Sequence, residues 1–217
     1  MFIRASLIVV LLLSFSGLQA EITENELSGL KLVSDSNKTQ VYVKPGIDMN
    51  KYNVLALGSL NVSLDEKWLR RFNRERKSLS ERLDSSDIKE LTDRYAKSCE
   101  QTLKKTLAEE SKFKMKKGAY THVLRVNSAI IDLKISAPDI QTATRKSMNV
   151  SRAGQATLET RMYDGETGKL VAVIIDKKKT REYSRPFATS RSRNMFEFTE
   201  VYRDWAKTWL DSLELKG

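Results

Sequence analysis

The 217-residue chain contains very few of the residues that build disulfides, metal sites and nucleophilic triads. It has one cysteine, Cys99, and one histidine, His122. A single thiol excludes an intramolecular disulfide, and one histidine with one cysteine gives no spacing that fits zinc. A Ser-His-Asp triad would depend on His122, and the sequence has no Gly-x-Ser-x-Gly elbow. We therefore expect no metal, no cofactor and no catalytic residue, and we favour a protein that is not an enzyme.

Both rare residues fall within regular patterns. Cys99 lies on the apolar stripe of a helical segment, so we expect it to be buried as a small hydrophobic residue. His122 stands at the start of a predicted strand. The glycine-containing "DGETGK" at Asp164–Lys169 lacks the spacing of a phosphate-binding loop and is expected to form a hairpin turn.

Only the N-terminus carries a long apolar run. In "MFIRASLIVVLLLSFSGLQA", Arg4 precedes apolar residues 5–15, and small residues follow up to Ala20. This pattern predicts a secretory signal peptide at 1–20 that is cleaved after Ala20. The run is shorter than the roughly 20 apolar residues that a membrane span needs, although an uncleaved signal anchor is the alternative. We expect an exported, periplasmic protein whose mature chain has no transmembrane segment.

The remaining chain predicts an α+β fold. Residues 21–38 are polar and are expected to be loosely ordered, and residues 39–217 are expected to form a single domain. The expected order of elements contains a helical crossover between two strands, followed by a hairpin. This order favours a mixed, largely antiparallel sheet with helices packed mainly on one face. The expected elements are strands at 40–44 and 52–62, helices at 64–83 and 85–110, a strand at 121–136, a hairpin at 154–176 and a helix from Asn194.

Each predicted helix has an apolar face. The basic residues Arg70, Arg74 and Lys77 lie opposite the apolar side of the helix at 64–83. The apolar faces are expected to comprise Leu64, Trp68, Phe72, Leu79 and Leu83 in that helix, Ile88, Leu91, Tyr95, Cys99, Leu103 and Leu107 in the next, and Phe198, Val201, Trp205 and Trp209 in the last.

Positive charge is concentrated in two segments. Residues 67–77 hold six basic residues and one acidic residue, and residues 177–193 hold seven and one, in a chain of net charge +10. Such local potential predicts an anionic partner, namely anionic phospholipid or lipopolysaccharide. Nucleic acid is disfavoured because aromatic residues are not interleaved with the charges. The candidate binding residues are Arg70, Arg71, Arg74, Lys77, Lys177, Lys178, Lys179 and Arg181. The alternative is that both segments are solvated surface.

Two further hypotheses come from other classes of protein. Glu159 and Asp176 could pair across the hairpin as the carboxylates of an enzyme whose motif is not recognised. A protein–protein adaptor in envelope assembly could instead add a partner strand to the strand at 40–44, which we expect to lie at the sheet edge.

Three stretches of the chain resemble a known family. They are "YVKPGIDMNKYNVLAL", the "DEKW" after it, and "AGQATLETRMYDGETGKLVAVIIDKK", and the likeness covers roughly residues 27–213. Its most specific residues are Tyr42–Gly46, Tyr52, Glu159, Asp164, Thr167, Gly168 and Asp176. The chain resembles a bacterial family of exported proteins and outer-membrane lipoproteins, the domain of unknown function 3313.

The resemblance implies an α+β domain in the periplasm or envelope of Gram-negative bacteria, and it implies no activity. One departure concerns anchoring. Many members of the family carry a lipobox cysteine at the end of the signal peptide, whereas "FSGLQA" at Phe15–Ala20 has none. We therefore expect a freely soluble periplasmic form without a lipid anchor.

Overall fold

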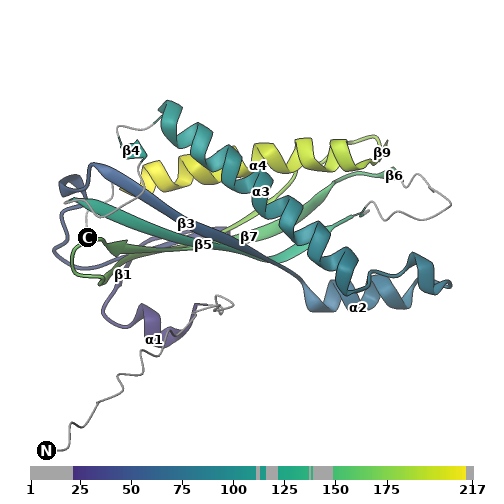
Figure 1. Cartoon of the computed structure of the whole chain (residues 1–217), viewed down its shortest axis with the longest axis horizontal. Coiled ribbons are helices and arrows are strands. Elements are labelled where there is room, and N and C mark those ends of the chain that lie inside the picture. Colours follow the sequence, from purple (N-terminus) through teal and green to yellow (C-terminus); the bar gives the residue numbers. More distant parts are fainter. Residues whose placement is uncertain (1–21, 111–112, 116–121, 137, 139–148, 214–217) are drawn as a thin grey trace, which may run out of the picture.

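A seven-stranded mixed sheet, with two long helices on one face, organises the computed structural model (Figure 1). The structure describes residues 22–110, 113–115, 122–136, 138 and 149–213, so the predicted signal peptide lies outside it. β3 is parallel to β4 and β5, and the other neighbouring strands are antiparallel. The strand order is β1 (Lys31–Asp35), β2 (Thr39–Val43), β8 (Leu170–Lys179), β7 (Gly154–Asp164), β5 (Val123–Ile135), β3 (Val54–Leu64) and β4 (Lys114–Met115).

Helices α3 (Ser85–Glu110) and α4 (Arg191–Leu213) cover one face of this sheet, and the short α1 (Glu24–Leu27) lies on the other side (Figure 1). Helix α2 (Glu66–Arg74) follows β3 at one end of the sheet. The strands β6 (Asn149–Val150) and β9 (Phe187–Ala188) pair separately as a small second sheet. The predicted α+β fold is confirmed.

The core lies between the sheet and the two long helices. On α4, the predicted face is buried, and Trp205 and Phe198 are both fully inaccessible to solvent. Helix α3 has the predicted bounds, and its stripe is buried except for the half-buried Ile88. Cys99 is completely buried, as expected, and this burial raises the pKa of its thiol. Rows of apolar side chains at helical spacing therefore account for how both helices sit on the sheet.

The N-terminal part of the structure corrects two expectations. Residues 21–38 were expected to be loosely ordered, but they contain α1 and β1. Strand β1 pairs antiparallel with β2, and β2 also pairs with β8, so β2 is an interior strand rather than the edge. The predicted edge at 40–44 was wrong because β1 has only five residues, of which only Leu32 and Val33 are apolar, so its sequence gives little strand signal by itself. Pairing with β2 supplies the backbone hydrogen bonds of β1.

The helix predicted at 64–83 is also shorter than expected. Helix α2 ends at Arg74, and a 3-10 turn at Leu79–Glu81 precedes α3. The side chain of Asn73 causes the change of direction, since it accepts a hydrogen bond from Leu83 N at 2.8 Å and donates one to Leu83 O at 3.0 Å. Trp68, Phe72 and Leu83 are buried as predicted, but Leu79 is 78% exposed. Its assignment to the buried face was wrong.

Candidate functional site

Four of the residues that carry the family resemblance, Tyr52, Asp164, Thr167 and Gly168, meet in a polar cluster around Asp164, in the turn between β7 and β8. Asp164 Oδ2 lies 2.7 Å from Lys51 Nζ and accepts a hydrogen bond from the Tyr52 hydroxyl at 2.9 Å. Its Oδ1 accepts hydrogen bonds from Thr167 N at 2.8 Å and Thr167 Oγ1 at 3.0 Å. Gly168 completes the turn with φ +67°, which only glycine adopts without strain. This cluster fixes the connector between β2 and β3 against the hairpin.

The charge state of the cluster suits this structural role. The hydrogen bond from Lys51, followed by those from Thr167, holds the pKa of Asp164 well below its usual range. Burial and the hydrogen bond with Asp164 raise the pKa of Tyr52 to about 12. At neutral pH the carboxylate is therefore ionised, the phenol is protonated and donates, and the donors and acceptors match.

The predicted carboxylate pair is not formed. In the β7–β8 ladder Glu159 lies opposite Ile175, whereas Asp176 lies opposite Leu158, so the two acids point to opposite faces of the sheet. Asp176 accepts a hydrogen bond from the Thr39 hydroxyl at 2.9 Å, on the helix-covered side. A one-residue difference in register separates the two groups, and the hypothesis of a catalytic pair is wrong.

Glu159 instead belongs to an ionic network beneath α1. Arg161, on the same face of β7, makes a bidentate pair with Glu26, with distances of 2.8 Å and 3.1 Å. Ile22 N donates to Glu159 Oε2 at 3.1 Å. The side chains of Glu159 and Arg161 are 3% and 4% exposed, so the N-terminal segment covers a charged pair. The network ties α1 to the centre of the open sheet face.

The sheet topology brings the two basic segments to one end of the molecule. The C-terminal ends of β3, β5 and β8 and the N-terminus of β7 coincide there, because β5 runs parallel to β3 and antiparallel to β7, which is antiparallel to β8. Helix α2 leaves β3 at this end, and the segment from β8 to the start of α4 crosses it (Figure 1). We call residues 66–84 and 177–196 together the basic end.

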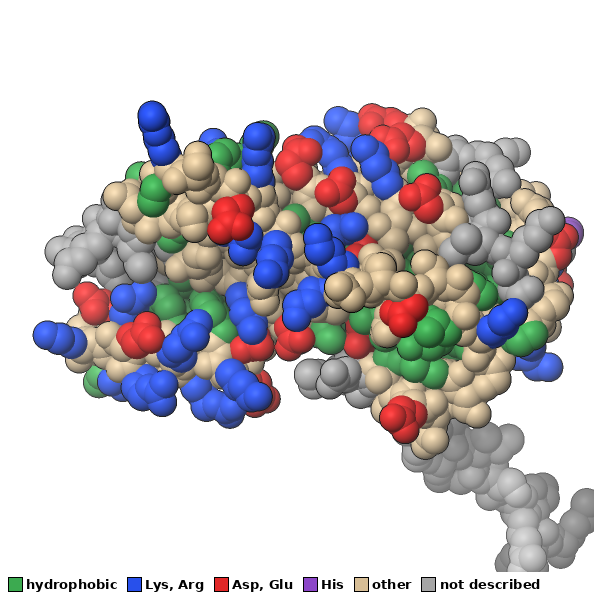
Figure 2. Space-filling model, turned by 180° about the vertical axis from the view of Figure 1, so that it is seen from behind, with side chains coloured by type: hydrophobic (Ala, Val, Ile, Leu, Met, Phe, Trp, Pro, Cys, Tyr) green, Lys and Arg blue, Asp and Glu red, His purple; other side chains and the backbone are tan. Residues whose placement is uncertain are grey.

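The basic candidates on α2 are accessible. Arg70, Arg71, Arg74 and Lys77 are all exposed. Arg70 Nη1 lies 3.3 Å from Glu66 Oε2, and Arg71 Nε lies 4.0 Å from Glu75 Oε1, along the helix surface. Figure 2, which shows the molecule from behind, has Lys and Arg side chains gathered on the lobe that holds α2 and across the middle of the face, with acidic side chains among them.

The candidates at the end of β8 differ from one another. Lys177 and Lys179 are exposed and lie on the sheet face away from the long helices, and Arg181 is exposed just beyond the strand. Lys178 lies on the opposite face, and its Nζ is 3.1 Å from Asp176 Oδ2, whose side chain is 1% exposed. Lys178 is therefore committed to the interior of the protein and does not belong with the surface-binding candidates.

Aromatic rings and Arg193 pack together at the start of α4. The rings of Tyr183 and Phe187 meet edge to face with centroids 5.1 Å apart. The guanidinium of Arg193 lies 5.1 Å and 5.0 Å from these two centroids, and 5.8 Å from that of Phe196. Arg193 Nη2 also pairs with the buried Glu197 at 3.0 Å, and Tyr183 donates to the same carboxylate at 2.7 Å. The second basic segment is thus fixed against α4.

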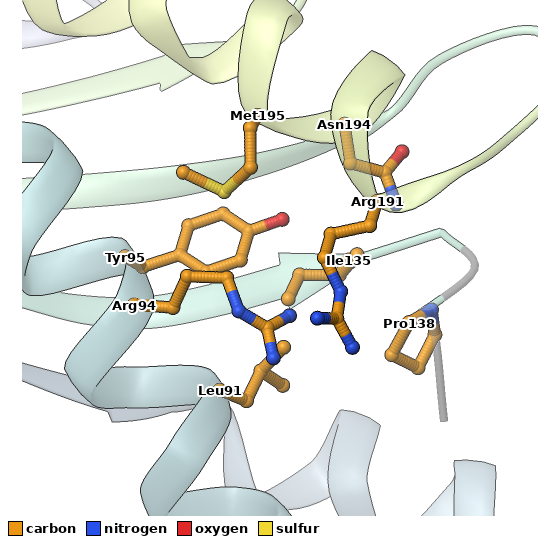
Figure 3. A pocket seen from close by; sticks show the side chains of 8 residues that line it. All are labelled: Leu91, Arg94, Tyr95, Ile135, Pro138, Arg191, Asn194 and Met195. Carbon is orange, nitrogen blue, oxygen red and sulfur yellow. The ribbon is translucent and has the colours of Figure 1, made fainter. Parts of the chain in front are cut away.

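A small pocket opens between α3 and α4 near the basic end (Figure 3). Its enclosed space of about 10 Å³ is enough for about one water molecule. Leu91, Ile135 and Pro138 supply apolar walls. Figure 3 shows the guanidinium groups of Arg94, from α3, and Arg191, from α4, turned toward each other across it. The pocket therefore combines a tight volume with two converging positive charges.

Tyr95 forms the polar part of the pocket floor. The residue is 2% exposed, and no partner for its hydroxyl is found among the residues that the structure describes. Figure 3 shows the hydroxyl directed into the pocket from the ring. Burial raises the pKa of Tyr95, so the group is a hydrogen-bond donor at neutral pH. The described buried polar atoms that lack a partner do not include this hydroxyl, so a solvent water can accept its hydrogen bond.

The sequence analysis assigned Tyr95 only to the core and did not select Arg94 or Arg191. Arg94 directly precedes Tyr95 on the border of the apolar stripe of α3. Arg191 was missed because the last helix was expected from Asn194, whereas it begins at Arg191, where Ser190 Oγ accepts a hydrogen bond from Arg193 N at 3.2 Å. Serine is a favoured N-cap residue, so Ser190 was the feature of the sequence that could have indicated a helix start at Arg191.

The described residues show neither a metal centre nor a membrane span. No group of three or more His, Cys, Asp and Glu side chains in this part of the chain could hold a metal ion. None of its helices is long and apolar enough to cross a bilayer. His122 is exposed at the start of β5, and its backbone N donates to Glu166 at 3.2 Å.

These features belong to a two-layer α+β domain. The model of the family "Protein of unknown function (DUF3313)" matches residues 19–209, and the chain belongs to this family. No curated protein matches the chain.

Solved structures resemble the chain at low sequence identity. The PelC dodecamer from Paraburkholderia phytofirmans is 10% identical and has a TM-score of 0.41, with 82% of this chain and 99% of that chain covered. Protein XCC0632 from Xanthomonas campestris is 12% identical, with a TM-score of 0.36 and coverage of 84% and 92%. A neuraminyllactose-binding hemagglutinin homolog from Helicobacter pylori is 10% identical, with a TM-score of 0.32 and coverage of 86% and 92%. Likeness at this level carries no functional argument.

Proposed function

We propose that this protein is an exported component of the bacterial envelope that attaches reversibly to an anionic surface, either anionic phospholipid or lipopolysaccharide, through its basic end. One observation supports this proposal above all. Two basic segments about a hundred residues apart in sequence lie at the same end of the fold. A local field of one sign attracts and orients a surface of the opposite sign.

The expected binding energy is sufficient for reversible attachment. Each Lys or Arg close to an anionic bilayer contributes about 1 kcal/mol, and the effect falls off within a Debye length of about 10 Å at moderate salt. The surface pairs of Arg70 with Glu66 and of Arg71 with Glu75 lie between highly exposed side chains. Such pairs are worth only about 0–1 kcal/mol, so they do not prevent these arginines from engaging a denser array of negative charge.

Two exposed apolar side chains support contact with a lipid surface rather than with a dissolved polyanion. Leu79 is 78% exposed and Phe196 is 57% exposed, and both belong to the basic end. Apolar residues beside basic ones suit the boundary between lipid headgroups and acyl chains. Phe196 also borders Arg193, whose guanidinium lies 5.8 Å from the centre of its ring.

The structure removes the main support for the other two hypotheses. A partner strand cannot add to β2, because β1 and β8 already occupy both of its sides. The enzyme hypothesis depended on Glu159 and Asp176, which lie on opposite faces of the sheet. Among the described residues, the basic end is the surface feature that best fits a binding function.

Charge reversal on α2 tests the proposal. A variant with Arg70, Arg71 and Arg74 changed to Glu should lose most of its sedimentation with phosphatidylglycerol vesicles at low salt. Three lost attractions replaced by repulsions correspond to several kcal/mol. Because these side chains are exposed, the unfolding midpoint should change little. Co-sedimentation across a salt series measures the loss.

A matched control lies on α3, toward its C-terminal end. Lys97, Lys104 and Lys105 are exposed, and reversing all three changes the net charge by the same amount. Lys104 and Lys105 also face glutamates on their own helix, as Arg70 and Arg71 do. This control should retain most of the binding. Equal loss in both triple variants, or equal sedimentation of the native protein with neutral and anionic vesicles, would contradict the proposal.

A further inference from the structure

Residues 22–30, which we call the strap, lie on the face of the sheet that the two long helices leave uncovered (Figure 1). No residue of the strap is buried, and its helix α1 has only four residues. A helix this short is not stable by itself in water, so its shape depends on the sheet beneath it. The strap contains two glutamates and no basic residue, in a chain of net charge +10. It is therefore an acidic segment of marginal stability that is seated on a basic protein.

The strap meets β7 at two points. Arg161 Nε and Nη2 donate hydrogen bonds to the two carboxylate oxygens of Glu26, at 2.8 Å and 3.1 Å. These bonds lower the pKa of Glu26, so its carboxylate is ionised at neutral pH. Ile22 N donates to Glu159 Oε2 at 3.1 Å. The side chains of Glu159 and Arg161 are 3% and 4% exposed, so both contacts are stronger than those of a solvated surface pair.

These two contacts define what the sheet face recognises. The guanidinium fork of Arg161 takes both oxygens of one carboxylate, which is the geometry that an arginine fork favours. The carboxylate of Glu159 takes a backbone N–H that lies four residues before Glu26 in the same peptide. A free phosphate or a lipid headgroup brings no peptide N–H for Glu159, whose negative charge would repel it. The site therefore fits an acidic peptide.

Release of the strap does not leave a lone charge inside the protein. Arg161 also faces Glu159 on the same strand, at 3.7 Å, and the two charges compensate each other when Glu26 is withdrawn. Gly29 joins α1 to β1 with φ +85°, and no atom lies within 4 Å of the position that a side chain would take there. A hinge at this glycine lets the strap swing away while β1 stays paired with β2. The closed and open states therefore differ by few interactions.

We propose that the strap is an autoinhibitory segment, which occupies a docking site for an acidic peptide of another protein. The partner peptide replaces the carboxylate of Glu26 and the N–H of Ile22 on the same atoms of Arg161 and Glu159, so it requires no contact that the strap does not already make. The strap, seated in the structure, is itself the observation that such a peptide fits. The site uses no residue of the basic end and does not depend on the proposed function.

Amide hydrogen exchange tests whether the strap opens separately from the rest of the fold. Glu26→Gln removes the charge but keeps an oxygen for the hydrogen bond from Thr23 N in the capping box. The strap amides should then exchange about tenfold faster or more, as expected for loss of hydrogen bonds to a charged group, while the amides of α4 keep their native rates.

Glu24→Gln is the matched control for this measurement. It removes the same charge from an exposed position in the first turn of α1 and should leave the exchange of the strap close to native. Equal acceleration in both variants would overturn the proposal. Strap amides that exchange as slowly as the core of α4 in the native protein would do so as well.

A synthetic peptide with the sequence of residues 22–30 probes the docking site. It is acetylated so that its first residue keeps an amide N–H. In the full-length variant Glu26→Arg, repulsion from Arg161 should unseat the strap and move the Nε–H resonance of Arg161 away from its native position. Added peptide should return this resonance toward that position. In the control variant Glu24→Arg, the resonance should stay native and should not respond to the peptide.

A second peptide, with glutamine in place of Glu26, tests the need for the carboxylate. It should require an about tenfold higher concentration for the same response. Return of the resonance by the acidic peptide alone supports the docking site. No return with either peptide, or an equal return with both, would show that the site does not take up an acidic segment.

Discussion

Replacement of Trp205 by alanine is expected to lower the free energy of unfolding by about 3–5 kcal/mol. The indole is fully buried, and its ring lies 5.7 Å from that of Tyr202 in a stacked arrangement. Its Nε1 donates a hydrogen bond at 3.1 Å to the backbone carbonyl of Asp176 on β8. The substitution therefore creates a large cavity and leaves a buried carbonyl without this donor, which adds to the loss of apolar contact.

Chemical denaturation measures the effect of Trp205→Ala. Lys207→Ala is the matched control on the same helix, because Lys207 is exposed, and it should stay within about 0.5 kcal/mol of the native protein. Trp205→Phe should cost less than Trp205→Ala, since the ring volume is largely kept while the hydrogen bond is lost. A loss below about 1 kcal/mol for Trp205→Ala would show that α4 does not pack as described.

The second large effect is expected at Asp164. Asp164→Ala should destabilise the protein by about 2–4 kcal/mol, because it removes an acceptor of hydrogen bonds from charged and neutral donors. The side chain of Asp164 is 8% exposed, and the loss would leave the buried hydroxyl of Tyr52 without this acceptor. The control is Asp48→Ala on the same connector, where an exposed aspartate caps a 3-10 turn and should cost about 1 kcal/mol.

The contribution of Asp164 should depend on pH in a defined direction. Its pKa in the folded state lies below the ordinary value of about 3.9, so the unfolded state takes up the proton first as the pH falls. The stabilisation is therefore present above about pH 4 and is lost on acidification through the folded-state pKa. The difference in unfolding free energy between native protein and Asp164→Asn should shrink from pH 5 to about pH 3. A difference that grows on acidification would contradict this account.

The long helices were predictable because their apolar residues repeat at helical spacing. In α3, Leu91, Tyr95 and Cys99 recur every four residues, and both bounds of the helix agree with the expectation. The hairpin was equally clear, since Asp164 and Gly168 mark the turn between two alternating segments. Local periodicity and turn chemistry require no knowledge of distant partners.

The elements that were missed depend on partners far away in sequence. Strand β1 has only five residues, and it forms by pairing with the backbone of β2. Helix α1 has four residues and is held by the pair of Glu26 with Arg161, which are 135 positions apart. The end of α2 depends on the hydrogen bonds between Asn73 and Leu83. None of these contacts leaves a periodic signal in the sequence.

The candidate site was only partly predictable for the same reason. Charge density identified the two basic segments, but only the strand order shows that they share one end of the fold. Lys178 was selected with its neighbours although its side chain pairs with the buried Asp176, because alternation along β8 was not combined with the position of the helices. The pocket required Arg94 and Arg191 to be brought together by the packing of α3 against α4.

The orientation of the bound protein tests the central claim most directly. Cys99 is completely buried and its thiol pKa is raised, so a cysteine introduced at the surface can be labelled selectively. Ser80 and Ser184 are exposed at the basic end, and Lys169 is exposed in the β7–β8 turn at the opposite end of the sheet. Three variants, each with one cysteine introduced at one of these positions and Cys99 retained, would carry the same environment-sensitive fluorophore.

Addition of phosphatidylglycerol vesicles at low salt should shift the emission of the probes at Ser80 and Ser184 to shorter wavelength, and added salt should reverse the shift. The probe at Lys169 should remain unchanged, because that end faces away from the bilayer when the basic end is bound. A shift of equal size at Lys169, or a response confined to it, would show that the protein does not bind anionic surfaces through its basic end.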